Sequence, residues 1–101
     1  MVEHLIVFNA EASPEEVRRM VAEVKAVLTQ IPGVLGLRYG EALSPGARYR
    51  YWLSVVFAGP EVVEVYRDHL LHVDFANRVF RPMAKDRITT DYLVLEGPCA
   101  P

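Results

Sequence analysis

The stretch Tyr51-Trp52-Leu53-Ser54-Val55-Val56-Phe57-Ala58 decides the fold, because it is the segment of the chain most typical of a β-strand. Aromatic and β-branched residues favour extended backbone. Side chains alternate between the two faces of a strand. Both faces of this one are largely apolar, whereas a sheet with one face in water alternates apolar and polar residues. We therefore expect the strand to be covered on both sides.

Three further segments have strand-like composition, and they are residues 2–8, 34–41 and 88–95. Two helices are expected among them. Ser13-Pro14-Glu15-Glu16 has the form of a capping box, which starts a helix, and Pro32-Gly33 ends it. Gly59-Pro60 opens a second helix over about residues 61–69, and residues 73–86 are expected to be irregular or to contain a short helical turn.

The resulting order is βαββαβ, which predicts an α+β, ferredoxin-like fold with a four-stranded antiparallel sheet and two helices on one face. Two helices cover only one face of the sheet. Because the other face is also apolar, we expect a homodimer that packs two open faces together as a dimeric α+β barrel.

Composition limits the possible classes of protein. Hydrophobic residues make up 51% and charged residues 24% of 101 residues, which indicates one globular domain, assigned to residues 1–96, with a flexible tail at 97–101. A net charge of −2 gives no reason to expect binding to nucleic acid or an anionic membrane. The single Cys99, the absence of a signal-like start and the absence of an apolar run of 18 residues favour a cytoplasmic protein.

Two of the three histidines lie close together in Tyr66-Arg67-Asp68-His69-Leu70-Leu71-His72. Imidazole changes its charge near neutral pH, and a neighbouring phenol can donate or accept a proton. This is where the sequence predicts chemistry, with Tyr66 and His72 as candidate catalytic residues.

Several segments, in order, resemble the stress-responsive dimeric A/B barrel (Dabb) family. They are His4-Leu5-Ile6-Val7-Phe8, Ile31-Pro32-Gly33-Val34, the Tyr66…His69…His72-Val73…Phe75 pattern and Asp91-Tyr92, so that the resemblance spans Val2 to Val94. The resemblance implies an α+β sandwich whose two sheets form a barrel across a dimer.

The family includes plant stress proteins, bacterial members without known activity and a plant polyketide cyclase that makes a resorcylic acid. By that resemblance His72 would be the general base of an aldol-type condensation, Tyr66 would hold a carbonyl oxygen, and His4 would face the pocket. This chain has Leu70 where the family often has proline, and Tyr51 where the cyclase has a further histidine.

The chain is thus expected to bind a small apolar or aromatic ligand between its second helix and the sheet. Candidate ligand-binding residues are His4, Tyr51, His69 and Arg38, and no cofactor or metal is expected. An enzyme that enolises a ketone, a cofactor-independent cyclase, isomerase or lyase, is the alternative. A quinol or haem monooxygenase of the related barrel superfamily is a further one.

Structural roles for the same residues stay open at this point. His72 can cap a helix C-terminus, Tyr66 can be a core residue, and His4 can be a barrel or interface residue. Arg38 can bind an anion inside the barrel or point to solvent at its rim. His69, His72 and Asp74 are also a conceivable metal set.

Overall fold

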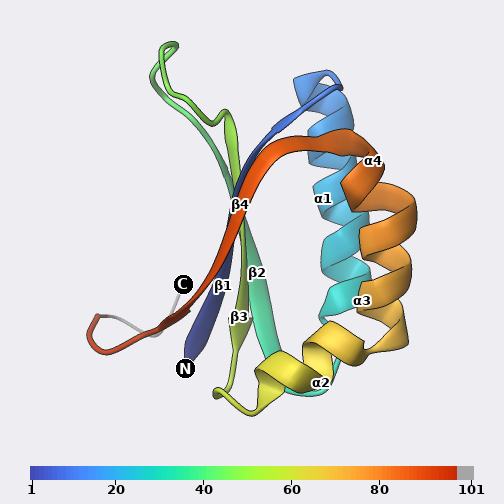
Figure 1. The fold of residues 1–101 in the computed structure, drawn as a ribbon, viewed down its shortest axis with the longest axis vertical. Coiled ribbons are helices and arrows are strands. Elements are labelled where there is room, and N and C mark those ends of the chain that lie inside the picture. The colour runs from blue at the N-terminus through green and yellow to red at the C-terminus, as the bar shows by residue number, and fades with distance from the viewer. Residues whose placement is uncertain (98–101) are drawn as a thin grey trace.

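Four antiparallel strands form one sheet in the order β2-β3-β1-β4. The computed structural model describes residues 1–97. The strands are β1 (Val2–Ala10), β2 (Val34–Glu41), β3 (Tyr51–Phe57) and β4 (Ala84–Leu93). The helical elements are α1 (Pro14–Leu28), α2 (Val62–Asp68), α3 (Leu70–Phe75), the π-helical segment η1 (Ala76–Phe80) and α4 (Arg81–Met83). All of them lie on one side of the sheet (Figure 1).

The expected α+β, ferredoxin-like fold is confirmed, and β2 has the bounds that its sequence predicts. The start of α1 also follows its sequence signal. The Ser13 hydroxyl accepts a hydrogen bond from the Glu16 backbone N–H at 3.2 Å and donates one to the Glu16 carboxylate at 3.1 Å. Pro14 occupies the first turn, where its missing N–H costs nothing.

The expectation for residues 73–86 is wrong. The chain stays helical through α3, η1 and α4, and β4 begins at Ala84, four residues before the expected start at Ile88. A π-turn inserts an extra residue into the helical repeat, which hides the 3.6-residue spacing in the sequence. Pro82 resembles a helix breaker, yet it lies in the first turn of α4, where proline is tolerated.

The core lies between the sheet and the helices. Buried residues of the sheet include Ile6, Phe8, Leu53, Val55 and Phe57, and those of α1 are Val17, Met20, Val21, Val24 and Leu28. No helix within residues 1–97 combines the length and hydropathy that a membrane span requires. Of the tail expected at 97–101, residues 98–101 lie outside the described part of the chain.

The opposite face of the sheet, here called the open face, is covered by no helix of residues 1–97 (Figure 1). The register assigns to it the side chains that alternate with the core residues. They are Glu3, Leu5 and Val7 of β1, Arg38 of β2, Trp52, Ser54 and Val56 of β3, and Ile88, Thr90 and Tyr92 of β4. The open face is therefore mostly apolar with a polar centre, in line with the expectation that both faces of the sheet are largely apolar.

Candidate functional site

Four aromatic side chains from four elements meet between the sheet and the second helix. The ring of Tyr66 in α2 has its centroid 4.2 Å from that of His72 in α3, 5.4 Å from that of His4 in β1 and 4.8 Å from that of Phe57 in β3. His4 and Phe57 are stacked at 5.9 Å. We call His4, Phe57, Tyr66 and His72 the ring cluster. It brings together three of the six residues that the sequence singles out.

A break in the helix allows Tyr66 and His72 to meet. His69 ends α2 and precedes α3 in an extended conformation, with ψ of 136°. Its Nδ1 atom accepts a hydrogen bond from the Leu71 backbone N–H at 3.1 Å and so caps α3. His69 therefore shapes the backbone of the site through its ring nitrogen.

His4 is held by a carboxylate on the next strand. His4 and Asp91 are direct partners in the pairing of β1 with β4, and His4 Nδ1 lies 2.5 Å from Asp91 Oδ1. At neutral pH a carboxylate only accepts hydrogen bonds, so Nδ1 carries the hydrogen and Nε2 of a neutral His4 ring keeps its lone pair. The His4 side chain is 16% exposed.

Asp91 is a residue of the site that the sequence analysis did not select as a candidate. None of its neighbours in β4 is a candidate catalytic or ligand-binding residue. The signal that finds it is the antiparallel register of β1 and β4, which is a tertiary property and cannot be read from either strand alone.

The environment of His72 favours a neutral imidazole. Burial lowers the pKa of His72, the hydrogen bond to the Arg67 backbone raises it, and the nearby His4 and Arg81 lower it further. His72 Nδ1 lies 3.1 Å from the Arg67 carbonyl oxygen, which only accepts, so the hydrogen is on Nδ1. Nε2 of the neutral ring is therefore an acceptor for a proton.

The Tyr66 hydroxyl stays protonated at neutral pH. Burial and the charge of Asp91 both raise the pKa of Tyr66, whose residue is only 4% exposed. Within residues 1–97 this hydroxyl makes no hydrogen bond, yet no fully buried side-chain oxygen or nitrogen there lacks a partner. The hydroxyl therefore keeps contact with solvent, where it can donate to a ligand.

Two other candidate residues lie away from the ring cluster. Tyr51 pairs with Phe8 at the opposite end of β3 from Phe57, and its ring packs against those of Phe8 and Tyr39. Arg38 lies on the open face, where its guanidinium is 5.6 Å from the ring centroid of Trp52. The ring cluster forms on the helix-covered face, so Arg38 and the ring cluster lie on opposite sides of the sheet.

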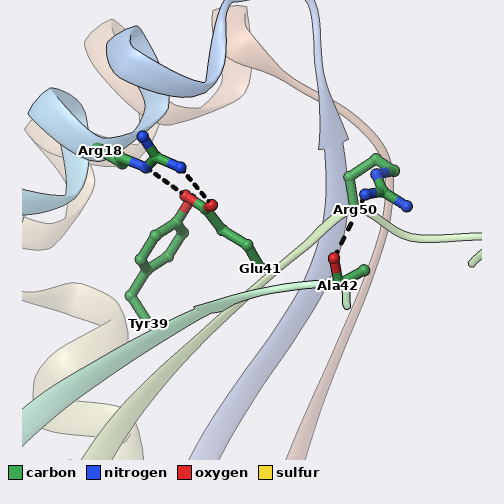
Figure 2. Close-up of polar contacts among 5 residues, drawn as sticks. All are labelled: Arg18, Tyr39, Glu41, Ala42 and Arg50. Carbon is green, nitrogen blue, oxygen red and sulfur yellow. Dashed lines mark hydrogen bonds and ion pairs between the residues drawn. The ribbon is translucent and has the colours of Figure 1, made fainter. Parts of the chain in front are cut away.

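A second polar cluster, absent from the sequence analysis, joins α1 to β2 (Figure 2). Arg18 donates from Nε and Nη2 to the two carboxylate oxygens of Glu41, each at 2.7 Å, and the Tyr39 hydroxyl donates to Glu41 at 2.8 Å. The bonds from Arg18 and Tyr39 lower the pKa of Glu41 to about 2. Burial and the bond to Glu41 raise the pKa of Tyr39.

Figure 2 also shows the Arg50 guanidinium beside the Ala42 carbonyl oxygen, at 3.4 Å, where the chain leaves β2. Arg50 makes a shorter bond, 2.7 Å, to the Ser44 carbonyl oxygen. The guanidinium groups of Arg18 and Arg50 thus both hydrogen-bond to oxygen atoms of the protein. These bonds stabilise this end of the sheet and do not form an anion site.

One hollow lies between the first helix, α1, and α3, the helical segment that follows His69. Its volume is about 210 Å³, and it is lined by Glu23, Val24, Val27, Leu71, Asp74, Phe75 and Val79. Within residues 1–97 no group of three or more His, Cys, Asp or Glu residues is placed to hold a metal ion, so the set of His69, His72 and Asp74 is not assembled.

Residues 2–94 match the model of the stress responsive A/B barrel domain, Dabb. The chain belongs to this family. No curated protein matches the Dabb chain described here. Three solved structures are similar to it. A Dabb family protein with a ferredoxin-like fold from Mesorhizobium loti is 27% identical, with 94% of this chain and 97% of that chain covered and a TM-score of 0.81.

The other two share the fold at lower identity. A dimeric ferredoxin-like protein of unknown function from Thermobifida fusca is 22% identical, with 92% and 90% of the two chains covered and a TM-score of 0.72. Hydroxynitrile lyase from Passiflora edulis is 16% identical, with 95% and 94% covered and a TM-score of 0.79. The Dabb fold thus occurs in an enzyme and in proteins whose function is unknown.

Proposed function

We propose that the ring cluster binds a small aromatic or apolar carbonyl compound and enolises it, with His72 as general base and Tyr66 as hydrogen-bond donor. The observation that carries the proposal is the contact between the Tyr66 ring and two imidazoles, one of them fixed by Asp91. Aromatic walls with a few fixed polar groups are typical of small-molecule sites. No cofactor is required for this chemistry.

His72 has the properties that a base needs at neutral pH. Its lowered pKa keeps the ring neutral, and the bond to the Arg67 carbonyl oxygen leaves Nε2 as the basic atom. Nε2 takes the proton next to the carbonyl, and the electrons of the C–H bond form the enolate. A positioned base of this kind contributes roughly a hundredfold to ten-thousandfold in rate.

Tyr66 acts on the carbonyl oxygen, and the abstracted proton returns from His72. The Tyr66 hydroxyl, which is protonated at neutral pH and whose pKa is raised further by burial, donates to the enolate oxygen and stabilises the charge that develops there. His72 carries the abstracted proton on Nε2 and returns it to the product, while His4, oriented by Asp91, is the second imidazole beside Tyr66. Return at another carbon gives an isomerase, and attack of the enolate on a second carbonyl gives a cyclase.

The test uses benzoylacetone as the probe, with proton NMR in deuterated buffer following exchange at its methylene carbon. The wild-type protein is expected to exceed the buffer rate, His72→Gln to return to that rate, and Tyr66→Phe to lie between them. Tyr39→Phe is the matched control because it removes a hydroxyl from the Glu41 cluster instead. Exchange that persists in His72→Gln removes His72 from the mechanism.

We also propose that the protein is a homodimer in which two open faces meet. Four strands do not close a barrel, whereas eight strands enclose a packed interior. The family description as a barrel and the dimeric Thermobifida fusca relative support this assembly. Native mass spectrometry tests it, since a monomeric mass contradicts the assembly.

The single cysteine is consistent with a reducing compartment, and we propose a cytoplasmic location on that ground. Fractionation of cells that produce the protein tests the location, because recovery outside the cytoplasm contradicts it.

A further inference from the structure

We propose that the ion pair of Glu3 and Arg38, anchored by Ser54, fixes the register in which two copies of this chain meet across their open faces. The inference rests on the homodimer proposed above and assigns the interaction that selects one arrangement of the two sheets. Apolar contacts alone specify the register of two facing sheets weakly, whereas a buried polar pair tolerates few positions.

The three residues form one connected group in the middle of the sheet. Glu3 comes from β1, Arg38 from β2 and Ser54 from β3, the strand between them. The Ser54 hydroxyl donates to Glu3 Oε1 at 2.7 Å, and Arg38 Nη2 donates to the same oxygen at 2.5 Å. Ser54 is fully buried, so it holds the Glu3 carboxylate in a fixed position.

Both charges are present at neutral pH, and both are incompletely paired. The bonds from Ser54 and Arg38 lower the pKa of Glu3. Within residues 1–97, Glu3 Oε2, Arg38 Nε and Arg38 Nη1 make no hydrogen bond. The Arg38 side chain is 54% exposed and that of Glu3 is 26% exposed. Each copy therefore presents a free carboxylate oxygen and free guanidinium N–H groups.

The surroundings of the pair on the open face are mostly apolar, with Thr90 of β4 among them. The other residues around it are Leu5, Val7, Trp52, Val56, Ile88 and Tyr92. The Trp52 indole lies against the backbone of Gly40, where an added Cβ would stand 1.9 Å from Nε1. Arg38 lies over the same indole. Covering this surface removes water from the charges, which is costly unless each charge finds a partner.

A second copy of the chain supplies both partners at once. In a two-fold assembly the same patch faces itself, so any contact from Arg38 to Glu3 of the second copy is repeated in the opposite direction. One cation and one anion side by side form a self-complementary surface with no net charge. This neutrality also disfavours a nucleic acid or another strongly charged partner for the open face.

Charge reversal tests the pair, with sedimentation and native mass spectrometry as readouts. Glu3→Arg and Arg38→Glu are each expected to weaken self-association roughly thirtyfold or more, because like charges then face each other. An equimolar mixture of the two variants is expected to form a heterodimer, since one variant contributes two cations and the other two anions. Glu23→Arg and Arg19→Glu on α1 are matched controls that are expected to dimerise normally.

The outcomes separate this inference from the proposals on which it rests. A monomeric wild-type protein contradicts the homodimer and the register pair together, while the benzoylacetone assay still tests the ring cluster. A dimeric wild-type protein whose charge-reversed variants dimerise with unchanged affinity, or whose mixture forms no heterodimer, overturns the register pair alone. If either variant fails to fold by circular dichroism, Glu3→Gln, Arg38→Gln and their double variant are used, and additive losses of affinity overturn the pair.

Discussion

His4 and Asp91 face each other on neighbouring antiparallel strands, with Nδ1 of the imidazole 2.5 Å from Oδ1 of the carboxylate. The same carboxylate contributes to the raised pKa of Tyr66. Asp91 therefore acts on two members of the ring cluster at once. It fixes which nitrogen of His4 carries the hydrogen, and it adds to the effect of burial, which raises the pKa of Tyr66.

Asp91→Asn is expected to release His4 from this arrangement, because an amide can donate as well as accept and no longer selects one tautomer. The Nδ1 proton signal of His4 in NMR should be lost, and the exchange rate of benzoylacetone should fall roughly tenfold. The stability should change by less than about 1 kcal/mol, because the Asp91 side chain is 41% exposed and water screens its charge.

Asp86→Asn is the control for this change, since Asp86 lies in the same strand and pairs with Arg48 instead. Its φ of 47° is one that asparagine tolerates well. Equal losses of rate in the two variants would show that Asp91 has no specific part in the site.

His72 is expected to make the protein less stable in mild acid. Its folded-state pKa lies below the ordinary value of 6.5, so the unfolded chain binds more protons between the two values. Stability therefore falls as the pH drops below about 6.5 and levels off below the folded-state pKa. Urea unfolding of wild type and His72→Gln from pH 7.5 to 4.5 measures this, and parallel curves for the two proteins contradict it.

Glu41 acts in a lower pH window. Its pKa is lowered from 4.5 to about 2, so the stabilisation is fully present above 4.5 and is lost as the pH falls toward 2. Glu41→Gln should be less stable than wild type at pH 6 and should converge with it near pH 2. Thermal unfolding across that range gives the comparison. Glu23→Gln changes an exposed carboxylate on α1 that makes no ion pair within residues 1–97, and it should show no such convergence.

Gly33 is expected to reject a side chain. Its φ is +89°, and an added Cβ would lie 2.6 Å from a methyl carbon of Val62 at the start of α2. Gly33→Ala should lower the free energy of unfolding by roughly 1–3 kcal/mol. Gly46→Ala, in an open turn with nothing within 4 Å, should be nearly neutral. Urea unfolding of both variants tests the contrast, and an equal effect at the two positions would count against backbone strain at Gly33.

Local signals sufficed for much of the fold. The bounds of β2 and the cap of α1 at Ser13 depend on residues close together in the chain, and both are confirmed. The start of β4 depends instead on how far helical structure runs past His72. The length of a helix is predicted from the 3.6-residue spacing of its apolar residues, and the π-turn of η1 interrupts this spacing. The predicted start of β4 is therefore four residues too late.

The candidate site was predictable in part for the same reason. Tyr66 and His72 are near each other in sequence, and the structure brings their rings to 4.2 Å. Asp91 belongs to the site only because β4 pairs with β1. Arg38 lies outside the site only because the register of β2 places it on the face away from the helices. Neither fact is contained in the neighbouring residues, since a shift of one residue in register would reverse both.

The extended conformation of His69 means that the ring cluster depends on the backbone at position 69 as well as on its own side chains. In an uninterrupted helix, residues six apart lie about 120° apart around the axis and about 9 Å apart along it, so Tyr66 and His72 would not touch. The break gives α3 its own direction and turns the two rings toward each other. A descendant of this chain that straightened the helix at position 69 would keep every residue of the ring cluster in its sequence and still lack the cluster.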